Sequence, residues 1–278
     1  MHQHCCTNKY SPVTHVIFDL DGTILDSEGL YVQVLKTVVE NHNRVFDDEY
    51  VLKVKGSVEG DVARIAVEGF QLDITEEQFL DEYHEYVYAQ LGDLDLMPGA
   101  ERVIKHLYSH NVPMAIATSS TPKAFGIKRK KHEELFALFD HIVCGGGDPE
   151  VLNGKPAPDI FLVAAARFPT KPKPSECLVF EDSGNGVKGA LAAGMQVIMI
   201  PDQSVPHDVW KSAHMRLDSF NYFVPGVFGL PPFPQEDLAL VFADTRLDPV
   251  RSMKDVFIIP EERAEKNLEV NEVLEKES

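Results

Sequence analysis

Cysteine and basic residues are both scarce in this sequence. Only four of its 278 residues are cysteine, namely Cys5, Cys6, Cys144 and Cys177, and their spacing suggests no disulfide framework. We therefore expect a reducing, cytoplasmic environment. The formal net charge is −18, with 26 basic residues against 44 acidic ones. This balance argues against nucleic acid polymers and anionic membranes as partners, because both attract basic surfaces.

Long apolar segments are absent as well. No run approaches the roughly 18 apolar residues that a membrane span needs, and the polar start of the chain does not resemble a signal peptide. The hydrophobic content of 44% is nevertheless ordinary for a globular protein. We therefore predict a soluble protein with one large domain, or one domain with a modest insert.

Short apolar runs alternate with helical patterns through most of the chain. Five runs have the length of buried strands, and a sixth short strand is predicted near residues 215–217. Helical patterns separate them, and strands that alternate with helices predict a parallel sheet covered on both faces. The five runs are His15–Asp19, Met114–Ala117, His141–Val143, Cys177–Phe180 and Gln196–Ile200, and the helical segments are 100–110, 122–138, 158–168 and 186–193.

Residues 28–95 break this alternation, because they contain helical patterns and no convincing strand. We read them as a small helical cap inserted after the first strand, with hinges at 25–28 and 95–99. The predicted fold is thus α/β, with a Rossmann-like parallel sheet core formed by residues 13–27 and 96–232. Residues 233–278 are a C-terminal extension to which we assign no role.

Polar residues follow the first two predicted strands directly. Asp19 and Asp21 form a D-x-D pair, and Thr118, Ser119 and Ser120 follow the second strand. Because ligands bind at the carboxyl ends of parallel strands, these carboxylates and hydroxyls are candidates for catalysis and for phosphate binding. Taken alone, each group has an ordinary alternative: the acids suit a turn, and the hydroxyls suit a helix cap.

The next two strand ends also carry charged residues. Lys155 follows the third strand in a proline-stiffened loop, and Glu181 and Asp182 end the fourth. Each could be a solvated loop residue, but four consecutive strand ends with acids, hydroxyls, a lysine and acids again favour one common site. The adjacent acids need a positive partner, and Mg²⁺ prefers such oxygen ligands. With Mg²⁺ and Lys155 present, a protonated Asp21 would leave the site near neutral and open to a phosphate dianion.

In these motifs the chain resembles the haloacid dehalogenase superfamily of phosphohydrolases, across about residues 13–232. The helical insert is similar to the small cap class of that superfamily. The matching segments are Phe18-Asp19-Leu20-Asp21-Gly22-Thr23, Thr118-Ser119-Ser120, Gly154-Lys155-Pro156 and Phe180-Glu181-Asp182-Ser183-Gly184.

The resemblance implies a role for each group. It implies that Asp19 attacks phosphorus and that Asp21 transfers protons to the leaving alcohol and from water. It also implies that Mg²⁺ is bound by Asp19, Asp182, the Asp21 carbonyl and Glu181, the last directly or through water. The expected phosphate-binding groups are Thr118, Lys155 and backbone amides that include those of Leu20 and Ser119.

The predicted function is therefore Mg²⁺-dependent hydrolysis of a small phosphorylated metabolite, by a chain for which we favour a monomer. A phosphomutase is one alternative, although Glu59 stands near where related β-phosphoglucomutases carry a phosphate-binding arginine. A non-enzymatic binding protein on the same fold is another. Lys53, Lys55 and Ser57 are candidates for substrate selection by the cap, and solvated positions are an equal alternative for them.

Overall fold

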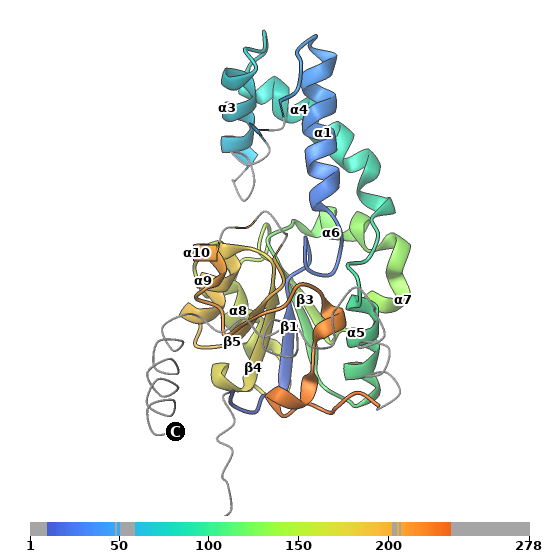
Figure 1. The fold of residues 1–278 in the computed structure, drawn as a ribbon, viewed down its shortest axis with the longest axis vertical. Coiled ribbons are helices and arrows are strands. Elements are labelled where there is room, and N and C mark those ends of the chain that lie inside the picture. The colour runs from blue at the N-terminus through green and yellow to red at the C-terminus, as the bar shows by residue number, and fades with distance from the viewer. Residues whose placement is uncertain (1–9, 48, 51–58, 202–204, 206, 235–278) are drawn as a thin grey trace, which may run out of the picture.

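A six-stranded parallel sheet forms the centre of the protein (Figure 1). The structure, a computed structural model, describes residues 10–47, 49–50, 59–201, 205 and 207–234. The strand order is β3-β2-β1-β4-β5-β6, so the chain builds one side of the sheet outward from β1 and then returns to build the other. The predicted α/β class is confirmed. The strands are β1 (His15–Phe18), β2 (Met114–Thr118), β3 (His141–Cys144), β4 (Cys177–Glu181), β5 (Gln196–Met199) and β6 (Met215–Arg216).

Alternate residues of each strand face the two sides of the sheet, and both sides are buried. In β1, Val16 and Phe18 belong to one hydrophobic cluster and Ile17 belongs to the other. Helices α5 (Ala100–Ser109) and α7 (Glu133–Phe136) contribute to the first cluster, whereas α8 (Asp159–Arg167) and α9 (Gly184–Ala192) contribute to the second. The continuous apolar strands of the sequence are explained by this double coverage.

The helix predicted over residues 122–138 is divided, so the prediction of one helix was wrong. Helix α6 (Pro122–Lys128) is followed by the 3₁₀ turn η2 (Lys130–His132) and then by α7. At the division, His132 Nε2 donates to the Leu94 carbonyl at 2.9 Å and Lys131 pairs with Asp93 and Asp95. The interruption lets basic side chains reach the insert while Leu135 and Phe136 of α7 stay buried in the core.

Three helices of the insert pack together beyond the carboxyl ends of the strands (Figure 1). They are α1 (Glu28–Asn41), α3 (Glu59–Gly69) and α4 (Glu76–Gln90), followed by the turn η1 (Leu91–Asp93). Thr75 begins α4 with a capping box, in which its hydroxyl and the Gln78 side chain bond each other's backbone amides. Buried residues such as Val38, Ala63 and Phe79 show that the insert has apolar contacts of its own. We propose the division into a cap of residues 28–95 and a core of residues 13–27 and 96–232.

The two segments that join insert and core run side by side. Leu25 and Leu96 form an antiparallel bridge, the Asp26 amide donates to the Asp95 carbonyl at 2.9 Å, and the Met97 amide donates to the Ile24 carbonyl at 2.8 Å. The hinges expected at 25–28 and 95–99 therefore pair with each other through backbone hydrogen bonds. A large movement of the insert relative to the core would break these backbone hydrogen bonds, so the pairing restricts such movement.

The C-terminal part of the core includes several short elements. They are η3 (Pro174–Glu176), α10 (His207–Trp210), η4 (Phe220–Tyr222) and η5 (Pro225–Phe228). Packing continues to Phe233, which is buried beneath the Arg102 guanidinium, whose central carbon lies 4.1 Å from the ring centroid. Residues 235–278, which make up most of the predicted extension, lie outside the described residues.

Within the described ranges, no helix has both the length and the apolar character that a bilayer span requires. Cys144 and Cys177 are buried free thiols, while Cys5 and Cys6 lie outside the described residues.

His214 gives the fold a predictable response to acid. Its Nδ1 accepts the Val197 amide of β5 at 3.2 Å, and burial lowers its pKa. The unfolded chain therefore binds a proton more readily, and stability should decrease as pH falls below about 6.5. We expect His214→Gln, which keeps an acceptor, to reduce the loss of stability between pH 7.5 and 5 in urea unfolding. A variant of exposed His110 should keep the full slope, and an unchanged slope in His214→Gln would contradict the assignment.

Candidate active site

The predicted catalytic acids lie between β1 and β4, where the order in which the chain adds strands to the sheet reverses. Strands β1 and β4 are neighbours, with Phe18 opposite Phe180, although the chain completes β2 and β3 between them. Asp19 follows β1 and donates its backbone amide to the Phe180 carbonyl at 2.9 Å. Glu181 is the last residue of β4. Open parallel sheets bind ligands at such switch points, because the connections there leave toward opposite faces.

Lys155 joins the ends of three strands. Its Nζ donates to Asp19 Oδ1 at 2.5 Å, to Glu181 Oε1 at 2.6 Å and to the Ala117 carbonyl at 3.1 Å. The lysine side chain is only 6% exposed. The structure thus brings Asp19, Lys155 and Glu181 together, although Asp19 is 136 positions and Glu181 is 26 positions from Lys155 in the sequence.

Burial and charge act on this cluster in opposite directions. Burial raises the pKa of Asp19 to about 7; the Lys155 ammonium opposes this rise and the nearby Glu181 carboxylate adds to it. Burial alone would lower the pKa of Lys155, but the two carboxylates raise it above its ordinary value. The two carboxylates therefore favour the charged form of Lys155, whereas the charge of the buried Asp19 carboxylate is only partly compensated.

The second carboxylate oxygen of Glu181, which does not contact Lys155, is held by residues that follow β4. Its Oε2 accepts the amides of Asp182 and Ser183 at 3.1 Å each and the Ser183 hydroxyl at 3.0 Å. Ser183 is also the N-cap of α9, and its hydroxyl accepts the Gly186 amide at 3.0 Å. A side chain at Gly186 would overlap the Glu181 carboxylate, so glycine is required at this close approach.

Asp21 contacts a lysine that the sequence analysis did not identify. Lys128 Nζ lies 2.5 Å from Oδ1 and 2.6 Å from Oδ2 of Asp21, and its side chain is 2% exposed. Desolvation would raise the pKa of Asp21, but the Lys128 ammonium, with hydrogen bonds from Lys128 and Ser120, holds it below the ordinary value. In this substrate-free arrangement the Lys128 ammonium therefore supplies the positive charge that the charge balance above assigned to a proton on Asp21.

The other predicted phosphate-binding residues lie at the same edge with different surroundings. Thr118 ends β2 and is buried, and its hydroxyl accepts the Ser120 amide at 3.1 Å. Ser119 is exposed, whereas the Ser120 hydroxyl donates to Asp21 Oδ2 at 3.0 Å. The Leu20 side chain is buried, so only its backbone remains for a phosphate. The roles of Thr118, Ser119 and Leu20 stay predictions.

Oxygen atoms suitable for a cation converge beside Asp19. One carboxylate oxygen from each of Asp19, Glu181 and Asp182 lies within 4.8 Å of the others. Gly22, with a φ of 74°, allows the Asp182 carboxylate to approach its Cα, where a side chain would overlap it. Hard oxygen ligands of this kind suit Mg²⁺.

The charges of the site agree with a divalent cation. Together with Asp21, the three acids give four carboxylates, which Lys128 and Lys155 only half neutralise. Two positive charges would therefore balance the set, and the residues present fit one Mg²⁺ ion.

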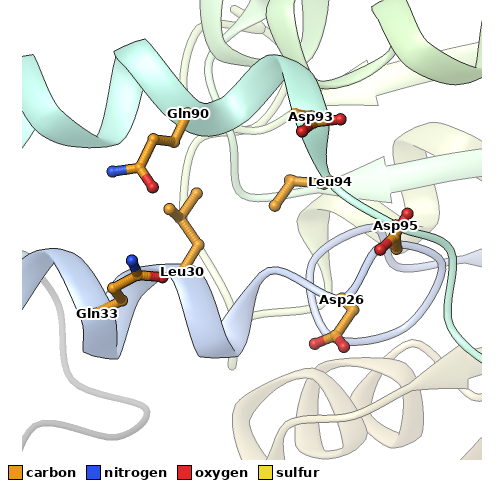
Figure 2. A pocket seen from close by; sticks show the side chains of 7 residues that line it. All are labelled: Asp26, Leu30, Gln33, Gln90, Asp93, Leu94 and Asp95. Carbon is orange, nitrogen blue, oxygen red and sulfur yellow. The ribbon is translucent and has the colours of Figure 1, made fainter.

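A cavity of about 230 Å³ lies elsewhere, beside the hinge between α1 and the end of α4 (Figure 2). Its lining includes Asp26, Asp93 and Asp95, and it contains none of the predicted site residues. Lys131 already pairs with Asp93 and Asp95. The ion-paired cluster at β1 and β4, and not this cavity, therefore defines the candidate site. The predicted specificity residues Lys53, Lys55 and Ser57 lie outside the described residues, as does the Glu59 side chain.

Comparisons with known proteins agree with the geometry. Residues 13–194 match the haloacid dehalogenase-like hydrolase family. A Drosophila melanogaster protein described as "probable pseudouridine-5'-phosphatase" is 45% identical over 80% of this chain and 96% of that protein. (DL)-glycerol-3-phosphatase 2 of Arabidopsis thaliana is 42% identical over 80% of this chain and 93% of its own length.

A solved structure shares the fold. It is a conserved haloacid dehalogenase-like protein of unknown function from Agrobacterium tumefaciens str. C58, similar with a TM-score of 0.64 and 24% identity over 84% of this chain and all of that one.

Proposed function

Because the chain belongs to the haloacid dehalogenase-like hydrolase family and is a phosphatase of small phosphorylated metabolites, we propose that it uses Mg²⁺ and an aspartyl-phosphate on Asp19. The observation that carries this proposal is the cluster of Asp19, Lys155 and Glu181 at the ends of β1 and β4, with Asp182 beside it. The cluster offers a nucleophile, a buried cation and ligands for a divalent ion within one site.

The first chemical step is attack by an Asp19 carboxylate oxygen on phosphorus. A phosphorus–oxygen bond forms to Asp19 while the bond to the leaving oxygen breaks. Lys155 and the Thr118 hydroxyl bind the non-bridging oxygens, helped by backbone amides of Leu20 and Ser119. Mg²⁺ bound by Asp19, Asp182, Glu181 and the Asp21 carbonyl would neutralise charge on the phosphoryl group.

Asp21 carries the proton in both halves of the reaction. A phosphate dianion beside it favours its protonated form, and that proton passes to the leaving oxygen as the alcohol departs. The Asp21 carboxylate then accepts a proton from water, whose oxygen attacks phosphorus and releases Asp19. Asp21 returns to its protonated form, so protons and bonds balance over the cycle.

The proposed first substrate is pseudouridine 5'-phosphate. Segments outside the catalytic motifs, including Leu96–Ala100 and Asp148–Val151, resemble pseudouridine-5'-phosphatases, and the Drosophila relative carries that description. The Arabidopsis relative is described as acting on glycerol 3-phosphate, which makes this compound the natural competitor in an assay.

A phosphate-release screen tests the proposal. The chain would be assayed with Mg²⁺ or with EDTA on pseudouridine 5'-phosphate, uridine 5'-phosphate, glycerol 3-phosphate and hexose phosphates. We expect Mg²⁺-dependent release, with the highest kcat/KM for pseudouridine 5'-phosphate. Release without metal, or none from any monoester, would refute the reaction. Preference for another monoester would refute only the substrate, and sugar phosphate interconversion without release would favour the mutase.

Asp21→Asn should separate the two halves of the reaction. The amide cannot take a proton from water, so steady-state turnover should fall by about 10²–10⁴-fold and the phosphoenzyme should accumulate. Acid quenching with ³²P-labelled 4-nitrophenyl phosphate, whose leaving group needs no proton from residue 21, followed by peptide mapping, should find the label on Asp19. A wild-type rate, or label on another residue, would contradict the assignment.

A further inference from the structure

Lys128 is a buried cation that the proposed reaction does not yet use. Its ammonium bridges both carboxylate oxygens of Asp21 and also donates to the Ser120 hydroxyl at 2.8 Å. Neither Asp19 nor the acids of β4 are among the described partners of Lys128, so its charge is directed at the proton-transferring residue. The two lysines of the site therefore serve different carboxylates.

Ser120 completes a triangle around Asp21. Its hydroxyl accepts from Lys128 and donates to Asp21 Oδ2 at 3.0 Å, so the positions of its proton and acceptor lone pair are both defined. Ser120 and Lys128 lie just before α6 and at its last residue, respectively. The Asp21 side chain remains 23% exposed, which leaves it accessible to a substrate. Ser120 and Lys128 thus both hold the Asp21 carboxylate from the segment that contains α6.

The same lysine reaches the cap. Lys128 Nζ donates to the Tyr31 hydroxyl at 3.0 Å, and Tyr31 lies in α1, shortly after the hinge. A movement of α1 away from α6 would break this bond and change the surroundings of the ammonium without touching Asp21 directly. Lys128 is therefore a physical link between the position of the cap and the orientation of Asp21.

A role in stability alone explains this arrangement poorly. A buried ammonium loses its hydration, and an apolar side chain of similar length often serves a core equally well or better. The cation instead contacts the one acid that must exchange protons during turnover.

We propose that Lys128 is a positioning residue that holds the Asp21 carboxylate for proton transfer and that Tyr31 couples this hold to the cap. The proposal rests on the proposed function, because it assigns Lys128 a part in that reaction. It predicts that Lys128 matters little for attack by Asp19 on a substrate with a good leaving group. It matters strongly for the steps in which Asp21 transfers a proton.

Pre-steady-state kinetics of Lys128→Met would test the first part. With 4-nitrophenyl phosphate and Mg²⁺, the leaving group needs no proton, so we expect a burst of about one nitrophenolate per site with a rate within about threefold of wild type. The steady-state rate that follows should be lower by about 10–100-fold, because Asp21 is no longer held against the attacking water. With an alkyl phosphate, whose leaving group does need a proton from Asp21, Lys128→Met should also lose the rapid first release of alcohol.

A double-mutant cycle would test the second part. Tyr31→Phe should lower the steady-state rate by about two- to fivefold in the wild-type background and should have no effect in Lys128→Met. A structural role of Tyr31 would give the same loss in both backgrounds. Lys131→Met is the matched control, because Lys131 also joins core to cap but contacts Asp93 and Asp95 instead of Asp21. It should keep the wild-type ratio of burst to steady-state rate.

Equal slowing of burst and steady state in Lys128→Met, or no change in either, would overturn the positioning role. An equal effect of Tyr31→Phe in both backgrounds would overturn the coupling to the cap. If Lys128→Met does not fold, Ser120→Ala should show the same separation with a smaller amplitude, and its absence would again overturn the proposal. Failure of the proposed function is visible separately, as a wild-type enzyme that shows neither a burst nor covalent phosphate.

Discussion

Replacing Asp19 with asparagine should abolish phosphate release while leaving the protein folded. The amide is a poor nucleophile, so we expect kcat to fall by about 10⁴-fold or more and no covalent phosphate to form. Lys155 keeps its bond to Glu181 at 2.6 Å, so the variant does not leave a buried ammonium without a partner. Because Asp19 is a buried acid with a raised pKa, its neutral replacement should fold at least as stably as wild type.

Turnover and thermal unfolding measured on one preparation would check both expectations. Asp140→Asn is a suitable control, because Asp140 accepts the Met114 amide at the opposite end of the sheet and contacts no predicted site residue among the described contacts. It should retain wild-type turnover. Asp19→Asn with near-wild-type activity would refute Asp19 as the nucleophile, and an unfolded Asp19→Asn would refute the expected tolerance of the cluster.

Replacing Lys155 with methionine should damage both activity and stability. Two buried carboxylates, Asp19 and Glu181, would lose their shared counter-charge, and breaking a buried pair in this way costs about 3–5 kcal/mol. Removal of a donor to the phosphoryl oxygens should also lower kcat by about 10²–10³-fold. Urea unfolding in EDTA would give the stability without a metal contribution.

A second substitution distinguishes charge from packing in this prediction. Lys155→Met combined with Glu181→Gln removes one of the two repelling carboxylates, so it should recover part of the stability but none of the activity. Lys131→Met provides the comparison at a more exposed ion pair, because its side chain is 33% exposed and its loss should destabilise the protein far less than the loss of Lys155. A Lys155→Met variant as stable as wild type would contradict the electrostatic account of the cluster.

The sequence was informative where burial follows simple periodicity. All five main strands were predicted to within one residue at each end, because strands covered on both faces read as continuous apolar runs. The helix over 122–138 was not predicted correctly, since its interruption at η2 depends on contacts of Lys131 and His132 with η1. Such contacts join segments about 38 positions apart and leave no local signal.

In the candidate site, too, residues at strand ends were predictable from the sequence, whereas a contact that depends on the tertiary fold was not. Asp19, Lys155 and Glu181 were predictable because parallel topology places successive strand ends at one edge. Lys128 was not identified, because it stands in a run of basic residues, Lys128-Arg129-Lys130-Lys131, that reads as a solvated surface. One signal was available: Lys128 lies three positions after buried Phe125 and thus on the same side of α6. The identity of its acidic partner follows only from the tertiary fold.

The bridge between Leu25 and Leu96 gives the helical insert two adjacent ends. Bridge partners in antiparallel strands have Cα atoms about 4.5–5.5 Å apart, a gap that a two-residue turn can close. Recombination that replaced everything between these two residues would therefore leave the strand order and the proposed nucleophile, Asp19, in place. A lineage could in this way exchange one helical insert for another while retaining the same sheet and the residues at its strand ends.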